Sequence, residues 1–269
     1  MPYAENHGVR IYYEVEGEGP PLVMGHGMGE GANLNAWRST GYTDELKKDY
    51  TLILFDFRGF GKSDKPKRDA TSRFSTADDI VAILDSLDIY QAHYLGYSMG
   101  ASAGFKLAVN YPDRFLSFML GGMTPGKWPQ EMIQAVKLSA DLAKLRRVDP
   151  EAYFKEMERL LGHPLNEPDR KELLAKDSGG GSNEQTVEHE SPGLSDEDLE
   201  RITVPCLLYC GDQDPFSKGA QEAVQPMPRG IFVSLDGLNH VTAFYRSDVI
   251  VPLAKQFLTI VTKNMPEQG

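Results

Sequence analysis

The chain has 269 residues, of which 41% are hydrophobic and 25% are charged, and its formal net charge is -11. This length and composition are ordinary for a globular protein and allow one large domain or two small ones. The acidic balance argues against a nucleic-acid partner, because phosphates call for a basic patch and the most basic stretch is only the short run at 62–68.

The start of the chain and its two cysteines bear on where the protein works. The first ten residues lack the basic and then apolar pattern of a secretory signal, and no run of about 18 apolar residues appears, so we expect a cytoplasmic protein without a membrane span. Cys206 and Cys210 lie in a predicted strand, which separates their Cα atoms by about 13 Å, whereas a disulfide needs about 7 Å or less. We therefore expect two buried, reduced thiols, and no nearby Cys or His pair suggests zinc.

The first half of the chain alternates predicted strands and helices. Residues 9–17 mix polar and apolar side chains, as in an antiparallel edge strand, and 50–59 is an apolar run typical of a strand buried on both faces. Residues 75–89 have the capping residues, the early aspartates and the apolar spacing of a helix. The predicted elements are, in chain order, strands at 9–17, 20–27 and 50–59, a helix at 75–89, a strand at 92–98, a helix at 99–112 and a strand at 115–122.

The second half begins with a stretch that lacks strand patterns. Amphipathic helices are predicted at 129–147 and 150–162, a further helix at 168–176, and a loop with almost no apolar residues at 177–193. The sheet pattern then resumes with strands at 204–214 and 230–237 and a closing helix at 247–263. We therefore predict an α/β fold with a mostly parallel central sheet and helices on both faces, formed by residues 1–123 and 204–269. Residues 124–203 are predicted to form a helical lid inserted over one end of that sheet.

A single serine, Ser98, stands between two glycines in "GYSMG" at 96–100, where a predicted strand runs into a predicted helix. In this context the glycines permit a sharp turn that exposes the serine oxygen above the sheet. The N–H of Met99 starts the helix, so it can face developing negative charge. A plain glycine-rich turn has the same five letters, so the motif needs partners elsewhere in the chain.

A serine becomes a nucleophile only when a base takes its proton. Among the six histidines, His240 is the best base, because it follows the last predicted strand and so leaves the same end of a parallel sheet as Ser98. His93 is predicted to lie too far along its strand to bend back, and His7, His163 and His189 are predicted to lie at the surface. Asp212 and Asp214 follow the strand before it, and either can orient the imidazole, although Asp beside Gly and Pro also serves in turns.

These features resemble the α/β-hydrolase family over nearly the whole chain. Five motifs appear in order and at family-like separations: "GHGMG" at 25–29, "DFRGFGKSD" at 56–64, "GYSMG" at 96–100, "GDQDP" at 211–215 and "LNH" at 238–240. The chain order serine, aspartate, histidine is also that of the family. Members with an aspartate nucleophile, the dehalogenases and epoxide hydrolases, are disfavoured because the residue at the turn is Ser98.

The resemblance assigns roles to further positions. It implies that Asp214 rather than Asp212 is the acidic partner of His240, and that the N–H groups of Met28 and Met99 form an oxyanion hole. His26 then anchors the turn that carries Met28. No cofactor and no metal are implied.

The resemblance predicts a carboxylic ester hydrolase that acts on a small molecule through an acyl-enzyme intermediate. Trp128, Met132 and Met123 are expected to wall the substrate pocket, and the protein to be a monomer or homodimer. The same catalytic residues are compatible with hydrolysis of lactones or of carbon–carbon bonds next to a ketone, and with peracid formation. A ligand receptor with this fold and little turnover is an alternative of another class.

Two rival motifs point to nucleotides. Residues 27–32 fit Gly-x-Gly-x-x-Ala after a strand, with Asp56 at the end of the next strand, as in a dinucleotide fingerprint. That hypothesis leaves the later serine, aspartate and histidine unexplained. The "GKS" at 61–63 lacks the earlier glycine of a P-loop, because Asp56 stands there.

Overall fold

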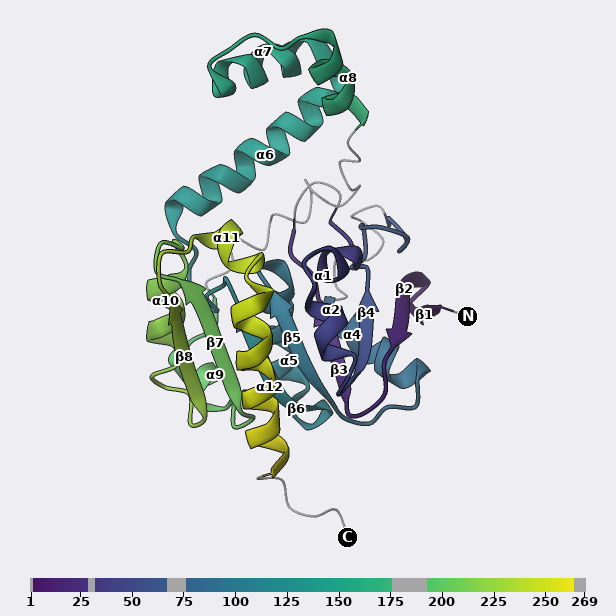
Figure 1. The fold of residues 1–269 in the computed structure, drawn as a ribbon, viewed down its shortest axis with the longest axis vertical. Helices are drawn as coiled ribbons and strands as arrows, with labels where there is room; N and C mark the ends of the chain where they lie inside the picture. Colours follow the sequence, from purple (N-terminus) through teal and green to yellow (C-terminus); the bar gives the residue numbers. More distant parts are fainter. Residues whose placement is uncertain (1, 29–31, 67–75, 176–192, 264–269) are drawn as a thin grey trace.

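The computed structural model describes residues 2–28, 32–66, 76–175 and 193–263. Within them, eight strands form one sheet in the order β1-β2-β4-β3-β5-β6-β7-β8 (Figure 1). The pairs β1–β2 and β2–β4 are antiparallel and the remaining pairs are parallel, which confirms the predicted fold class. The strands are β1 (Tyr3–Asn6), β2 (Val9–Glu16), β3 (Pro21–Gly25), β4 (Thr51–Phe55), β5 (Ala92–Tyr97), β6 (Phe115–Gly121), β7 (Cys206–Gly211) and β8 (Gly230–Leu235).

The edge of the sheet differs from the prediction. Strand β2 is antiparallel to its neighbours, as expected, but the edge strand is β1, which pairs with it from Tyr3 opposite Tyr12. His7 and Gly8 join the two strands, and both have positive φ, at 50° and 80°. Two such residues match the twist of a tight hairpin. A strand of four residues before that turn carries too little pattern to be found in the sequence.

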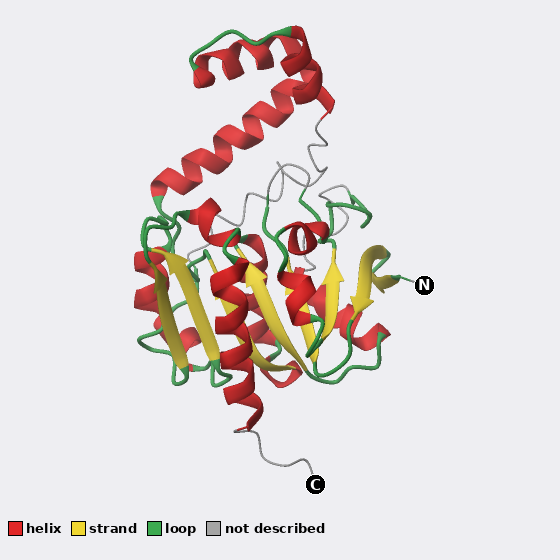
Figure 2. Ribbon diagram, in the orientation of Figure 1, coloured by secondary structure: helices red, strands yellow, loops and turns green. Residues whose placement is uncertain are grey.

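The two faces of the sheet carry separate apolar layers because side chains alternate along a strand. On β5, Tyr94 faces a cluster that includes α4, α5 and α10, whereas Leu95 and Tyr97 face a cluster that includes α1, α2 and α12. Helices therefore cover both faces of the sheet (Figure 2). Their bounds are α1 (Asn35–Ser39), α2 (Tyr42–Leu46), α4 (Thr76–Ser86), α5 (Met99–Asn110), η1 (Pro112–Arg114), α10 (Ser217–Ala223), α11 (His240–Phe244) and α12 (Ser247–Lys263).

The described residues between β6 and β7 form helices, as predicted. These are α6 (Gln130–Val148), α7 (Pro150–Leu161), α8 (Glu167–Ala175) and α9 (Asp196–Glu200). In Figure 1, α6 rises obliquely from the sheet end where α11 lies, and α7 and α8 lie at its far end. Helices α6, α7 and α8 have an apolar cluster of their own, with Tyr153, Phe154 and Leu165 buried in it.

The helical segment leaves and rejoins the core at a narrow neck. The N–H of Leu194 donates to the carbonyl of Pro125 at 2.9 Å. Leu199 and Ile202, which follow the neck, are buried in the core cluster. The chain therefore rejoins the core before the predicted boundary at residue 203. The loop predicted at 177–193 lies outside the described residues except for Gly193.

Candidate active site

Ser98 occupies a strained turn between β5 and α5. Its φ is 54° and its ψ is -114°, a backbone conformation that residues other than glycine rarely adopt. The turn is fixed at both backbone groups, because the N–H of Ser98 donates to the carbonyl of Gly121 at 2.8 Å and its carbonyl accepts from the N–H of Ser102 at 2.9 Å. Such strain persists where the surrounding structure fixes the backbone, and it clusters at functional sites.

The flanking glycines are required by close packing. A Cβ on Gly96 would lie 2.5 Å from the carbonyl oxygen of Gly100, and a Cβ on Gly100 would lie 2.0 Å from the carbonyl oxygen of Gly25. Gly25 and Gly96 are register partners at the ends of β3 and β5. Helix α5, which follows Ser98, therefore starts in direct contact with the backbone of the neighbouring strand β3.

The loops after β7 and β8 are joined by backbone hydrogen bonds. The N–H of Asp212 donates to the carbonyl of Leu235 at 3.0 Å, and that of Gln213 donates to the carbonyl of Leu238 at 3.0 Å. These two bonds hold the segment that carries Asp214 beside the segment that carries His240. Both loops leave the carboxyl ends of parallel strands, at the same edge as Ser98.

Ser98, His240 and Asp214 form one hydrogen-bonded row. The Oγ of Ser98 lies 3.1 Å from Nε2 of His240, and Nδ1 of His240 lies 2.9 Å from Oδ2 of Asp214. The other carboxylate oxygen of Asp214 accepts the N–H of Phe216 at 3.0 Å. The Asp214 side chain is fully buried, whereas 22% of the His240 side chain is exposed. Asp212, the alternative left open by the residues alone, is exposed to solvent.

This arrangement fixes the tautomer of His240. A carboxylate only accepts hydrogen bonds, so Nδ1 carries a proton that it donates to Asp214. Nε2 then accepts from the hydroxyl of Ser98. The row can therefore take a proton from Ser98 and stabilise the charged imidazole that results.

The sequence context of His240 suggested a loop. In the structure, His240 is instead the first residue of α11. Asn239 caps this helix, since its Oδ1 accepts the N–H groups of Val241 at 3.0 Å and Thr242 at 2.9 Å. The hydroxyl of Thr242 accepts the N–H of Asn239 at 2.9 Å in return. The reciprocal pair is a capping box, and it fixes where the helix begins.

Met28 and Met99 carry the two N–H groups predicted to face an oxyanion. The loop that holds Met28 runs past the serine, because a Cβ on Gly27 would lie 3.4 Å from the Cβ of Ser98. Met99 is the first residue of α5, where the helix supplies no acceptor for the N–H. Neither N–H donates a hydrogen bond within the described part of the chain.

His26 is buried beneath this loop, away from the row. Its Nδ1 lies 2.8 Å from the carbonyl oxygen of Gly27, and its Nε2 accepts the N–H of Phe57 at 3.3 Å. Burial lowers the pKa of His26, so the neutral ring is favoured. A neutral imidazole that donates at one nitrogen and accepts at the other joins the loop after β3 to the loop after β4.

Asp56 has a structural role that leaves little support for a dinucleotide site. Its carboxylate is buried, and its two oxygens accept the N–H groups of Leu34 and Lys62, each at 2.7 Å. A ribose ligand would need those oxygens. Residues 29–31 of the candidate glycine motif lie outside the described residues.

A cavity of about 420 Å³ opens at Ser98 between α1 and α11. The predicted walls do not line it. Met123 is buried in the core cluster, Met132 packs against that cluster, and Trp128 packs its ring against Phe216, 5.2 Å between centroids. The cavity is lined instead by Gly27, Met28, Ala32, Asn33, Asn35, Ala36, Ser39, Tyr97, Ser98, His240, Val241, Phe244 and Tyr245.

Sequence reasoning missed both walls of this cavity. Helix α1 has only five residues and gave no recognisable pattern. On α11, Phe244 follows His240 by four residues, and Tyr245 follows Val241 by four. A helix predicted there would therefore have placed these side chains close to His240. Apart from His240, the described residues of the lining carry no ionisable group other than the tyrosine phenols.

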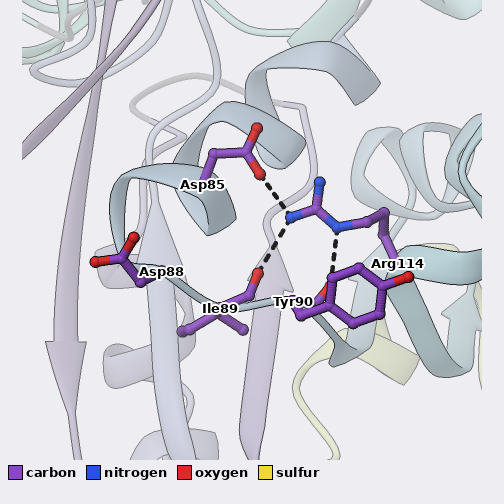
Figure 3. Close-up of a pocket in the computed structure, with 5 residues that line it drawn as sticks. All are labelled: Asp85, Asp88, Ile89, Tyr90 and Arg114. Atoms are coloured by element: carbon purple, nitrogen blue, oxygen red, sulfur yellow. Dashed lines mark hydrogen bonds and ion pairs between the residues drawn. The ribbon is translucent and has the colours of Figure 1, made fainter.

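A second hollow of about 320 Å³ lies near the start of β5, at the opposite end of the strand from Ser98 (Figure 3). Arg114 lies at its centre and donates to Asp85 at 2.6 Å and to the carbonyls of Ile89 at 3.1 Å and Tyr90 at 2.8 Å. These bonds tie the connection between α4 and β5 to η1. The hollow is thus explained by local structure.

Among the described residues, no group of three or more His, Cys, Asp and Glu side chains could hold a metal ion. No helix in the described ranges is long and apolar enough to cross a membrane. Cys206 and Cys210 are free and buried, as predicted, and burial raises the pKa of each thiol to about 12.

A family model described as the alpha/beta hydrolase fold matches residues 20–226. The chain is 34% identical over 144 residues to 2-hydroxymuconate semialdehyde hydrolase of Pseudomonas sp. (strain CF600), which covers 52% of this chain and 50% of that protein. The chain spans about half the length of the curated relatives it matches at this level of identity.

Two solved structures show the same fold. One is a carboxylesterase structure from the ammonia-oxidizing Thaumarchaeon Nitrososphaera gargenis, with a TM-score of 0.77, 20% identity, and coverage of 98% of this chain and 100% of that one. The other is the enol-lactonase from Burkholderia xenovorans LB400, with a TM-score of 0.70, 23% identity, and coverage of 96% and 100%. At these identities the likeness concerns the fold alone.

Proposed function

The chain belongs to the α/β-hydrolase family, and from that premise we propose that it is a serine hydrolase that cleaves a small, uncharged carboxylic ester. The observation that carries this proposal is the hydrogen-bonded row Ser98–His240–Asp214 on a turn where Ser98 has positive φ. A strained serine, a base within reach and a buried carboxylate behind the base are the three parts of an activated nucleophile.

The first half of the proposed reaction forms an acyl-enzyme. The oxygen of Ser98 attacks the acyl carbon while its proton passes to Nε2 of His240. The charge that develops on the carbonyl oxygen is stabilised by the N–H groups of Met28 and Met99. Asp214 stabilises the imidazolium. The tetrahedral intermediate then collapses, the C–O bond to the alcohol breaks, and His240 returns the proton to the departing alcohol.

The second half frees the acid. A water molecule loses a proton to His240 and attacks the acyl carbon, and the same N–H groups hold the second oxyanion. The bond to Ser98 breaks, and the proton on His240 returns to the serine oxygen. One ester and one water become one acid and one alcohol, so no cofactor is consumed.

The lining of the cavity supports an uncharged substrate. The wall toward α1 offers neutral polar side chains, including Asn35 and Ser39, and the wall toward α11 is largely apolar. A substrate that carried a carboxylate in this cavity would lose hydration without an opposite charge among the described lining residues. Esters and lactones avoid that penalty. The helical segment between β6 and β7 stands at the same end of the sheet, and we propose it as a lid.

The first experiment tests the assignment of the site. Ser98→Ala is expected to lower kcat for a p-nitrophenyl ester by about 10⁴-fold or more, and Asp214→Asn by about 10⁴-fold. Asp212→Asn provides the matched control, because Asp212 is exposed in the same loop, and its kcat should stay near that of the wild type. Ester turnover that survives in Ser98→Ala would overturn the assignment.

The second experiment tests the class of bond. The wild type is compared on p-nitrophenyl acetate and butyrate, a neutral γ-lactone, a dienoate ketone that carries a carboxylate, and acetate with peroxide. The proposal requires the highest kcat/KM on a neutral ester. A preference for the dienoate would assign carbon–carbon bond hydrolysis instead, and one acyl group bound per chain without further turnover would assign a receptor.

A further inference from the structure

The position of His240 depends on a helix too short to hold itself. Helix α11 has five residues, and an isolated helix of that length is not stable in water because its nucleation costs more than so few bonds return. The cap at Asn239 fixes where the helix begins but attaches it to nothing else. Tertiary contacts must therefore set where the imidazole lies relative to Ser98.

Tyr97 makes such a contact from the strand that carries the serine. Its hydroxyl donates to the backbone carbonyl of His240 at 2.6 Å, and its ring centroid lies 5.6 Å from that of the imidazole. The ring is almost fully buried, and burial raises the pKa of its hydroxyl far above the ordinary value, so the hydroxyl keeps its proton. Gly122 leaves space for it, since a Cβ there would lie 2.8 Å from the hydroxyl oxygen.

Tyr42 makes the corresponding contact at the other end of α11. Its hydroxyl donates to the carbonyl of Phe244 at 3.1 Å, and the two rings stack with centroids 5.9 Å apart. Phe244 in turn packs against Tyr97, 5.0 Å between centroids. Two buried phenols thus hold the first and last residues of the helix.

Tyr209 is a natural control for these contacts. It lies on β7, its ring is 6.1 Å from that of Tyr97, and it is fully buried. Its hydroxyl has no hydrogen-bond partner among the described residues. Loss of this hydroxyl therefore removes a buried oxygen of the same chemistry without removing a bond to α11.

We propose that Tyr97 is a positioning residue that places His240 for proton transfer through the backbone of α11, and that Tyr42 supports it from the far end. This inference rests on the proposed function of the Ser98–His240–Asp214 row. The residue before the serine is thereby assigned a role in the reaction, although its hydroxyl points at the backbone rather than at a reacting atom.

The test compares Tyr97→Phe, Tyr42→Phe and Tyr209→Phe in the full-length protein. Each variant removes one hydroxyl and keeps the ring. Loss of one hydrogen bond is worth about 1 kcal/mol, so we expect kcat for a p-nitrophenyl ester to fall about fivefold in Tyr97→Phe, with KM unchanged within about twofold. In Tyr42→Phe we expect kcat to fall about twofold, and in Tyr209→Phe we expect kcat to match that of the wild type.

A second readout does not depend on the choice of ester. The rate of covalent labelling of Ser98 by a fluorophosphonate is measured for each variant, and thermal unfolding gives the folded fraction. Labelling in Tyr97→Phe should slow in proportion to kcat while the protein remains folded at the assay temperature. Equal kcat and labelling rates in Tyr97→Phe and Tyr209→Phe would overturn the inference and leave the proposed function intact. Absence of labelling in the wild type would overturn the proposed function itself.

Discussion

The end of the sheet that carries Ser98 and the helical segment α6–α8 are built in different ways. At the sheet end, the backbone of α5 packs so closely on those of β3 and β5 that glycines are required, and buried clusters lie on both faces of the sheet. In α6–α8, one small cluster around Tyr153 and Phe154 holds three helices together, and the neck at Pro125 and Leu194 joins them to the core. The candidate chemistry lies where tertiary contacts leave the backbone little freedom.

The difference in packing implies a difference in stability. Cooperative units with few buried apolar contacts open at lower free energy than the core of a domain. The cluster of α6–α8 shares no residue with either cluster of the sheet, and Met132 in the first turn of α6 is packed against the core. We therefore expect the part of α6–α8 beyond that turn to open separately from the sheet. Matched substitutions in the two regions test this difference in stability.

The largest effect is expected from glycine substitutions. Gly100→Ala places a Cβ 2.0 Å from the backbone oxygen of Gly25, which cannot move without breaking the sheet, and should cost the roughly 5 kcal/mol or more that holds a typical domain together. Gly162→Ala, at the end of α7, meets no atom within 4 Å and should cost about 1 to 2 kcal/mol for its φ of 75°. Circular dichroism and thermal unfolding measure both. If Gly100→Ala unfolded at the same temperature as the wild type, the packing argument would be contradicted.

Phenylalanine truncations give the next largest effect. Phe118→Ala in β6 and Phe154→Ala in α7 each empty a buried site and should each cost about 3 to 5 kcal/mol. Hydrogen exchange should quicken through the whole sheet in Phe118→Ala, but only within α6–α8 in Phe154→Ala. If Phe154→Ala also quickens exchange in β5, the two regions are one cooperative unit and the comparison fails.

Acid should act on the sheet more than on the helical segment. His93 is buried in β5 with Nδ1 2.8 Å from the hydroxyl oxygen of Ser117, and burial lowers its pKa to about 4. The unfolded chain, with an ordinary pKa near 6.5, binds more protons between those values, so the free energy of unfolding falls as pH drops from about 6.5 toward 4. The full loss is roughly 3 kcal/mol. His163, in the helical segment, is exposed.

The acid effect is measured from urea unfolding between pH 7 and pH 4.5. His93→Gln keeps a polar side chain that does not titrate, so its stability should fall less steeply across this window. His26 is buried in the sheet region and contributes in the same direction, so some slope should remain. Identical slopes in the variant and the wild type would show that His93 is not the group responsible.

Some of these features follow from local patterns in the chain. The strands at the centre of the sheet were predicted because each is a continuous apolar run, and α12 because its apolar spacing is regular. Strand β1 and the helices α1, α2 and α11 were missed, because each has only four or five residues, too few to establish a period. The residues that line the cavity were missed for the same reason, since six of the thirteen belong to α1 and α11.

Patterns in the amino-acid sequence predict the turn at Ser98, the order of the residues that can activate it, and the sheet that carries them. Those features depend on side-chain period and on glycines, which act over a few residues. The three-dimensional structure was needed to show which walls face the serine and what holds α11 in place. Each of those depends on contacts between loops far apart in the chain, such as Gln213 with Leu238 and Tyr97 with His240, for which no local pattern exists.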